Sequence, residues 1–193
     1  MLFTTSELHN RADAYLAATR QEKFASLESL CESFAFDSDI EYDIFLSNRY
    51  VDKKSVTGLA TMLREDFNLS VYIDWEDDLD RNNVNKETAQ VIRRIIKSCK
   101  CLWYVASEHA DASKWMPWEV GYMDGKTGRV AICPVVKTTI DDVYEGREYL
   151  SLYPYVSKQK DTDGAMQLWI NETAEKYVGF KAWLLGKEPK TQH

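Results

Sequence analysis

The segment from Tyr42 to Ala60, YDIFLSNRYVDKKSVTGLA, decides the fold class of this chain. It opens with Tyr42–Ser47, a short apolar run that is typical of a buried strand. A polar turn follows, and from Ser55 onward apolar residues return at the three- and four-residue spacing of a helix face. A buried strand followed closely by an amphipathic helix is the repeating unit of a parallel sheet.

The same alternation continues on the C-terminal side of this segment. Further strands are predicted from short apolar runs, and helices from runs with helical periodicity between them. We therefore predict an α/β fold, a flavodoxin-like doubly wound parallel sheet of about five strands. The remaining predicted strands are Ser70–Asp74, Cys101–Ala106, Arg129–Val135 and Tyr153–Val156; the remaining helices are one with Ala89, Ile92, Ile95, Ile96 and Cys99 on its inner face, a short one at Trp115–Met123, and a long aromatic-rich terminal helix at Ala165–Leu185.

The N-terminal part, from about Thr4 to Phe36, has a helical pattern without glycine or proline. Thr4 and Glu7 have the spacing of a capping box, and the helix is either continuous or broken near Arg20. We predict a helical extension over residues 1–39, a main domain over residues 40–186, and a polar tail over residues 187–193 that frays.

Composition excludes several classes of function. The 193 residues carry 31 acidic and 24 basic side chains, a formal net charge of -7, which disfavours nucleic-acid binding. Neither a basic leader followed by an apolar stretch nor an apolar run long enough to span a membrane is found, so a soluble cytoplasmic protein without membrane contact is expected. The four cysteines lie in apolar patterns and are expected to be free thiols. The cysteines and the scattered histidines lack the spacing of a metal site, and no metal is expected.

In a doubly wound sheet, ligands bind beyond the carboxyl ends of the strands. The loops after Ser47, Asp74 and Ala106 are therefore the places where a functional site is expected.

Four ordered motifs resemble a known family. They are YDIFLSNRY from Tyr42, VYIDWEDDLD from Val71, the CLWYVAS strand ending at Ser107, and Trp115-x-x-x-Glu119 followed by a strand ending in Cys133-Pro134. In this order and at these separations they resemble a Toll/interleukin-1 receptor (TIR) domain over residues 40 to 157. The resemblance is to stand-alone bacterial members of the Thoeris defence type, and it implies a TIR fold and an enzyme that cleaves NAD+.

The resemblance implies that Glu119 is the catalytic carboxylate. Departure of nicotinamide leaves an oxocarbenium-like ribose, whose positive charge a carboxylate can stabilise. Trp115 stands one helical turn earlier, on the same side, and either touches the ligand or belongs to the core. Trp118 is expected to pack, and Pro117 is tolerated in the first turn of the helix. The alternative is that Glu119 is only a charged surface residue of a short helix. The motif Trp115-x-x-x-Glu119 favours the catalytic role instead.

Further substrate-binding residues are expected at the strand ends. Ser47, Asn48 and Arg49 follow the first strand, and the guanidinium of Arg49 could bind a diphosphate or form a surface ion pair instead. Asp74 and Trp75 follow the second strand, where the Trp75 ring could stack on a base. The acidic run after Trp75 lacks the Pro-Gly turn of animal receptors. The alternative to a substrate-binding or subunit-contacting loop is therefore a solvated loop without such a role. Ser107 follows the third strand and is also expected to bind substrate.

The leading hypothesis is an NAD+ glycohydrolase or ADP-ribosyl cyclase with no cofactor, because NAD+ is the substrate. The resemblance implies that its ADP-ribose-derived product acts on a separate effector in antiviral defence, and that the enzyme self-associates through the Trp75–Asn85 loop. Two alternatives are a non-enzymatic TIR scaffold and a nucleoside-processing enzyme that cleaves an N-glycosidic bond.

Overall fold

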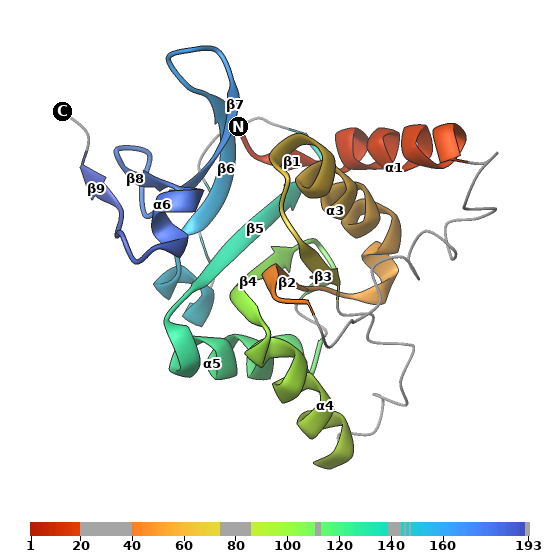
Figure 1. The fold of residues 1–193 in the computed structure, drawn as a ribbon, viewed down its shortest axis with the longest axis vertical. Helices are drawn as coiled ribbons and strands as arrows, with labels where there is room; N and C mark the ends of the chain where they lie inside the picture. The colour runs from red at the N-terminus through yellow and green to blue at the C-terminus, as the bar shows by residue number, and fades with distance from the viewer. Residues whose placement is uncertain are drawn as a thin grey trace.

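Five parallel strands form the centre of the protein, as Figure 1 illustrates. The computed structural model describes residues 1–19, 40–73, 86–110, 113–138, 144, 146 and 148–191. In space the central strands lie in the order β3-β2-β4-β5-β6, which is the second-first-third-fourth-fifth order of a flavodoxin-like sheet and confirms the predicted fold class. Their bounds are Tyr42–Ser47 for β2, Val71–Ile73 for β3, Cys99–Ala106 for β4, Val130–Val136 for β5 and Tyr155–Lys160 for β6.

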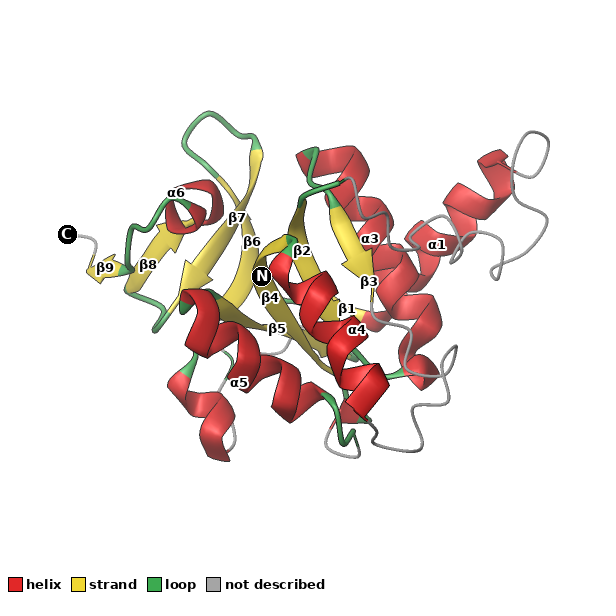
Figure 2. Cartoon of the chain, turned by 60° about the horizontal axis from the view of Figure 1, so that its bottom comes forward, coloured by secondary structure: helices red, strands yellow, loops and turns green. Residues whose placement is uncertain are grey.

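Helices cover both faces of this sheet. Figures 1 and 2 show α1 and α3 over one face and α4 and α5 over the other. Successive side chains of a strand point to opposite faces, so Ile44 and Leu46 pack against α1 and α3, whereas Phe45 packs in the core beneath α4 and α5. The helices are α1 (Thr5–Thr19), α3 (Lys53–Phe67), α4 (Lys86–Lys97) and α5 (Met116–Thr127).

Local sequence explains where the first helices begin and end. The Thr4 hydroxyl accepts a hydrogen bond from the backbone N–H of Glu7 at 3.3 Å, which confirms the predicted cap of α1. Helix α3 ends at Asn68, which adopts the left-handed conformation with φ 54°. Residues 20–39, the remainder of the predicted N-terminal helical extension, lie outside the described residues.

The first residues of the chain take part in the main sheet. Strand β1 (Phe3–Thr4) pairs in parallel with the end of β5, and Phe3 and Leu8 are fully buried in the same core as α3. The predicted boundary at residue 39 lies outside the described residues and stays a prediction.

The long terminal helix predicted over Ala165–Leu185 is wrong. That segment instead forms two antiparallel strands and a short helix, and among the described residues the sheet reaches nine strands, more than the five expected. Residues 190 and 191 of the tail, which was expected to fray, pair with β8. The elements are β7 (Met166–Asn171), β8 (Lys176–Gly179), α6 (Phe180–Leu184) and β9 (Lys190–Thr191).

The reason for this error is that the apolar residues of the segment fit both the period of a helix and the period of a strand. Leu168 and Ile170 are buried in the α1/α3 core, whereas Trp169 between them is half-buried, which is the two-residue period of a strand. The preceding turn fixes the hairpin, because the Asp161 carboxylate accepts backbone hydrogen bonds and Gly164 adopts φ 82°. Antiparallel pairing with β6 therefore makes this segment a strand and not the predicted helix.

The thiols that the structure describes are buried and free, as expected: Cys99, Cys101 and Cys133. Burial raises the pKa of Cys99 to about 12 and also raises the pKa values of Cys101 and Cys133. They therefore stay protonated and unreactive at neutral pH. No helix in the described ranges is long and apolar enough to cross a membrane.

Gly58 lets α1 and α3 approach closely. A Cβ atom at this position would lie 1.9 Å from the backbone oxygen of Leu8, so Gly58→Ala must push α1 off α3. We expect it to lower the free energy of unfolding by about 1–3 kcal/mol, the usual cost of overpacking, in urea denaturation. Gly125→Ala on α5 is the matched control, because a Cβ there meets nothing within 4 Å. Equal stability of the two variants would contradict the close contact.

Candidate functional site

A buried hydrogen bond joins the carboxyl end of the sheet to α5. Ser47 is the last residue of β2, and Glu119 lies in the first turn of α5. The Ser47 hydroxyl donates to Glu119 Oε2 at 2.6 Å, and both residues are fully buried. Such a short bond to a carboxylate is a strong one. The structure thus brings together two of the predicted site residues that are 72 positions apart in sequence.

This pair lies at the point where the strand order reverses. β2 has β3 on one side and β4 on the other, and the helices that follow β2 and β4 cover opposite faces. Ligands of flavodoxin-like sheets bind at this switch point, beyond the carboxyl ends of the strands. The Ser47–Glu119 pair therefore lies at the position where sheets of this kind bind their ligands.

Tyr104 is a neighbour of the pair that the sequence analysis missed. It is the residue of β4 directly opposite Ser47, so both side chains point to the α4/α5 face. Beside Tyr104 and Pro117, a cavity of about 510 Å³ opens against the start of α5. Its volume falls within the range of small-molecule sites. The alternation of β4 predicts the side of Tyr104, but only the strand register shows that it lies next to Ser47.

Trp115 supports the start of α5. Its backbone oxygen accepts the N–H of Glu119 at 2.9 Å, and its ring is 4% exposed and edge-to-face with Trp118 at 5.5 Å. Trp118 in turn stacks on Tyr122, and the Arg93 guanidinium lies 5.3 Å from the Trp118 ring. Trp118 packs, as expected. Trp115 lies one helical turn before Glu119 and is buried in the core on the α4/α5 side of the sheet.

Asn48 and Arg49 follow Ser47 at the strand end. Asn48 is 1% exposed, and Arg49 is half-buried at the start of the short helix η1 (Tyr50–Asp52). Within the part of the chain that the structure describes, the buried Arg49 Nε has no hydrogen-bond partner, and no ion pair of Arg49 is found. A buried guanidinium donor without a partner is available to an anionic ligand.

Ser107 lies on the other side of the sheet. Its hydroxyl donates to Asp52 Oδ2 at 2.5 Å, and Asp52 Oδ1 lies 2.9 Å from His109 Nδ1. Ser107 follows Val105 on β4, which faces the α1/α3 core, whereas Tyr104 faces Glu119. The structure therefore separates Ser107 from the Ser47–Glu119 pair. Asp74 and Trp75, which were expected to complete the site, lie outside the described residues.

Comparison with known proteins gives close relatives, although no protein-family model matches the chain. Over 191 residues the chain is 41% identical to the probable 3′ cyclic ADP-D-ribose synthase ThsB′ of Bacillus cereus (strain MSX-D12), covering 95% of this chain and 97% of that protein. It is 26% identical over 95 residues to the putative cyclic ADP-D-ribose synthase TIR2 of Cytobacillus dafuensis, covering 48% of this chain and 24% of that protein.

The strand order, the buried Glu119 on α5 and these relatives define the class as a TIR-domain protein, in agreement with the sequence motifs. With 41% identity over nearly the whole length of both chains, the protein belongs to the ThsB′ family of TIR proteins.

The Ser47–Glu119 hydrogen bond predicts energetic coupling between the two residues. Removing the hydroxyl in Ser47→Ala leaves a buried carboxylate without that donor, which should lower the free energy of unfolding by about 1–3 kcal/mol. In a double-mutant cycle with Glu119→Gln, we expect a coupling energy of about 1 kcal/mol or more, measured by urea denaturation.

Ser98→Ala serves as the control for this cycle, because the Ser98 hydroxyl donates to the Ile95 backbone oxygen at the opposite end of β4. Its effect should add to that of Glu119→Gln. Additivity of Ser47→Ala as well would show that the short hydrogen bond contributes no stability.

Proposed function

We propose that this protein cleaves the bond between nicotinamide and ribose in NAD+ and makes a cyclic ADP-ribose. The single observation that carries the proposal is the fully buried Glu119 carboxylate held by Ser47 at the switch point of the sheet. The name of the ThsB′ relative, a probable 3′ cyclic ADP-D-ribose synthase, supports the choice of substrate and product.

The chemistry needs one fixed negative charge. When the C1′–N bond breaks, its electron pair leaves with nicotinamide, and positive charge develops on the ribose carbon. A carboxylate that is already oriented and desolvated stabilises this charge without reorganising, which is where electrostatic catalysis gains most. The hydrogen bond from Ser47 fixes the orientation of Glu119, and so we assign Glu119 the catalytic role and Ser47 a positioning role.

The ribosyl cation is then captured by an oxygen. If a hydroxyl of the same molecule attacks, a C–O bond forms, the hydroxyl proton is released, and the product is cyclic; if water attacks, the product is ADP-ribose. Restricting water at the site favours the cyclic product. Arg49 is suited to hold the diphosphate through its unused Nε donor, and Trp115 to border the nicotinamide ribose. Asn48, Asp74 and Trp75 complete the proposed binding set.

The biological setting is part of the proposal. A cyclic ADP-ribose released in the cytoplasm would act on a separate effector in antiviral defence, as the resemblance to Thoeris-type proteins implies. A TIR scaffold without enzymatic activity would have no need of a buried carboxylate, because an unneeded buried charge is a cost to stability.

Glu119→Gln tests the catalytic assignment. The amide keeps the volume and loses the negative charge, so NAD+ cleavage should fall on the order of a hundredfold or more while the circular dichroism spectrum stays native. Release of nicotinamide, followed by chromatography, measures the rate, and mass spectrometry of the product distinguishes cyclic from hydrolysed ADP-ribose. Glu87→Gln, an exposed position on α4, is the matched control and should cleave at the wild-type rate.

Two outcomes would overturn the assignment. Near-normal cleavage by a folded Glu119→Gln variant would remove Glu119 from catalysis. Release of free base from a nucleoside, with NAD+ left intact, would instead support a nucleoside-processing enzyme.

Self-association is proposed as the means by which activity is controlled. The segment from Trp75 to Asn85 lies outside the described residues; β3, which precedes it in sequence, ends at the carboxyl edge of the sheet. Contact of this loop with a second copy would exclude water from the site and fix the nucleotide, and both effects raise the rate.

Specific activity should therefore rise with protein concentration. A dilution series read beside light scattering measures this, and changes at Trp75 or Leu79 should reduce the rise without unfolding the protein. Full specific activity from a demonstrated monomer at every concentration would refute the proposal.

A further inference from the structure

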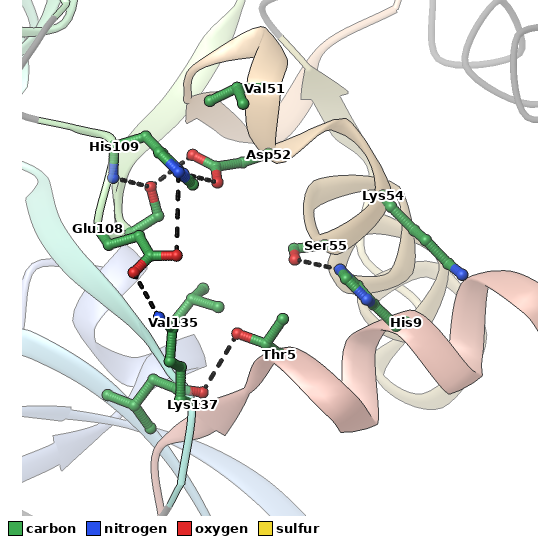
Figure 3. A pocket seen from close by; sticks show the side chains of 12 residues that line it. Thr5, His9, Val51, Asp52, Lys54, Ser55, Glu108, His109, Val135 and Lys137 are labelled. Carbon is green, nitrogen blue, oxygen red and sulfur yellow. Dashed lines mark hydrogen bonds and ion pairs between the residues drawn. The ribbon is translucent and has the colours of Figure 1, made fainter.

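A second cavity lies on the α1/α3 face of the sheet, away from Glu119. Its volume is about 530 Å³, within the range of small-molecule sites. Figure 3 shows two groups of polar side chains facing each other across it, one from α1 and α3 and the other from η1 and the loop after β4. The proposed NAD+ chemistry uses none of these side chains.

The first group offers hydrogen-bonding side chains at the start of α3. His9 of α1 lies 3.0 Å, Nε2 to Oγ, from the hydroxyl of Ser55, which is 6% exposed in the first turn of α3. Lys54 of α3 also lines the cavity, and its ammonium forms an ion pair with Asp13 at 2.8 Å. Burial, assisted by Lys54, lowers the pKa of His9, so the imidazole is mainly neutral at pH 7 and can exchange hydrogen bonds with Ser55.

The second group offers acceptors. Asp52 stands at the N-cap position of α3, yet its carboxylate makes no cap hydrogen bond. Instead it binds Ser107 and His109, and its side chain is 9% exposed. A carboxylate has about four acceptor positions, so Asp52 retains the capacity to accept hydrogen bonds from a ligand. The neighbouring Glu108 is paired with Lys137 at 2.7 Å.

Apolar walls separate the two polar groups. They are formed by Val51, which is 60% exposed, and by Val135 and Val136 at the end of β5. A ligand that fits this arrangement has an anionic end, a set of hydroxyl donors and a flat apolar part.

We propose that this cavity is a second ligand site, which binds a ribonucleoside monophosphate without cleaving it. The phosphate lies at His9 and at Ser55 in the first turn of α3, the ribose hydroxyls donate to Asp52, and the base packs on the valines. Asp52 follows Arg49 by three residues, and its backbone N–H donates to the Arg49 oxygen at 3.0 Å. An occupied site therefore touches the loop that carries the proposed diphosphate donor of the NAD+ site.

Titration calorimetry with AMP tests the site, in the absence of NAD+. We expect AMP to bind the wild-type protein and to bind about tenfold more weakly to Ser55→Ala and to His9→Ala, because each change removes a hydrogen-bonding group at the phosphate end. Adenosine, which lacks the phosphate, should bind more weakly than AMP, and inorganic phosphate more weakly still. Gln90→Ala, an exposed position on α4, is the control and should bind as the wild type does.

The readout does not depend on NAD+ cleavage, so it stays decisive whether or not the proposed enzymatic function holds. Thermal unfolding checks that each variant folds, and His9→Gln replaces His9→Ala if the alanine variant does not fold. Unchanged AMP affinity in folded Ser55→Ala and His9 variants would place the nucleotide elsewhere and overturn the proposal. Failure of the wild-type protein to bind AMP at millimolar concentration would also overturn it.

Discussion

The two-residue alternation of the central strands is the constraint on which the rest of the structure depends. Because neighbouring side chains of β2 and β4 point to opposite faces, each face needs its own helices, and the chain divides them between α1 with α3 and α4 with α5. The same alternation continues past the strand ends. It sends Ser47 and Tyr104 towards α5 and Ser107 towards α3, so that the carboxyl edge of the sheet carries two separate polar sites.

At the first site, burial and hydrogen bonding act together. A carboxylate with no exposed surface is unfavourable unless polar groups replace its water, and the Ser47 hydroxyl is one such group. Burial of the Glu119 carboxylate therefore costs folding free energy, and it holds the carboxylate desolvated and in a fixed orientation. That position is of little use to packing, but it suits a reaction in which positive charge develops next to the carboxylate.

At the second site, Asp52 connects elements that are distant in sequence. Its bonds to Ser107 and His109 tie the loop after β2 to the loop after β4, at the point where the strand order reverses. Arg49 is the N-cap residue of the short helix that ends at Asp52. The two proposed sites therefore share one loop, with Arg49 and Asp52 at its two ends.

The sequence by itself determined the elements whose signals are local. The apolar run of β2, the Thr4 cap and the stop at Asn68 each depend on residues a few positions apart, and the motif around Glu119 predicted a site carboxylate that the structure buries on α5. Tertiary structure decided the rest. The segment over β7 and β8 suited a helix or strands until β6 offered an antiparallel partner, and no local pattern shows that Ser107 bonds Asp52 or that Tyr104 lies beside Ser47. Pairing register and the sides of a sheet are set by contacts between segments far apart in the chain, which sequence periodicity does not record.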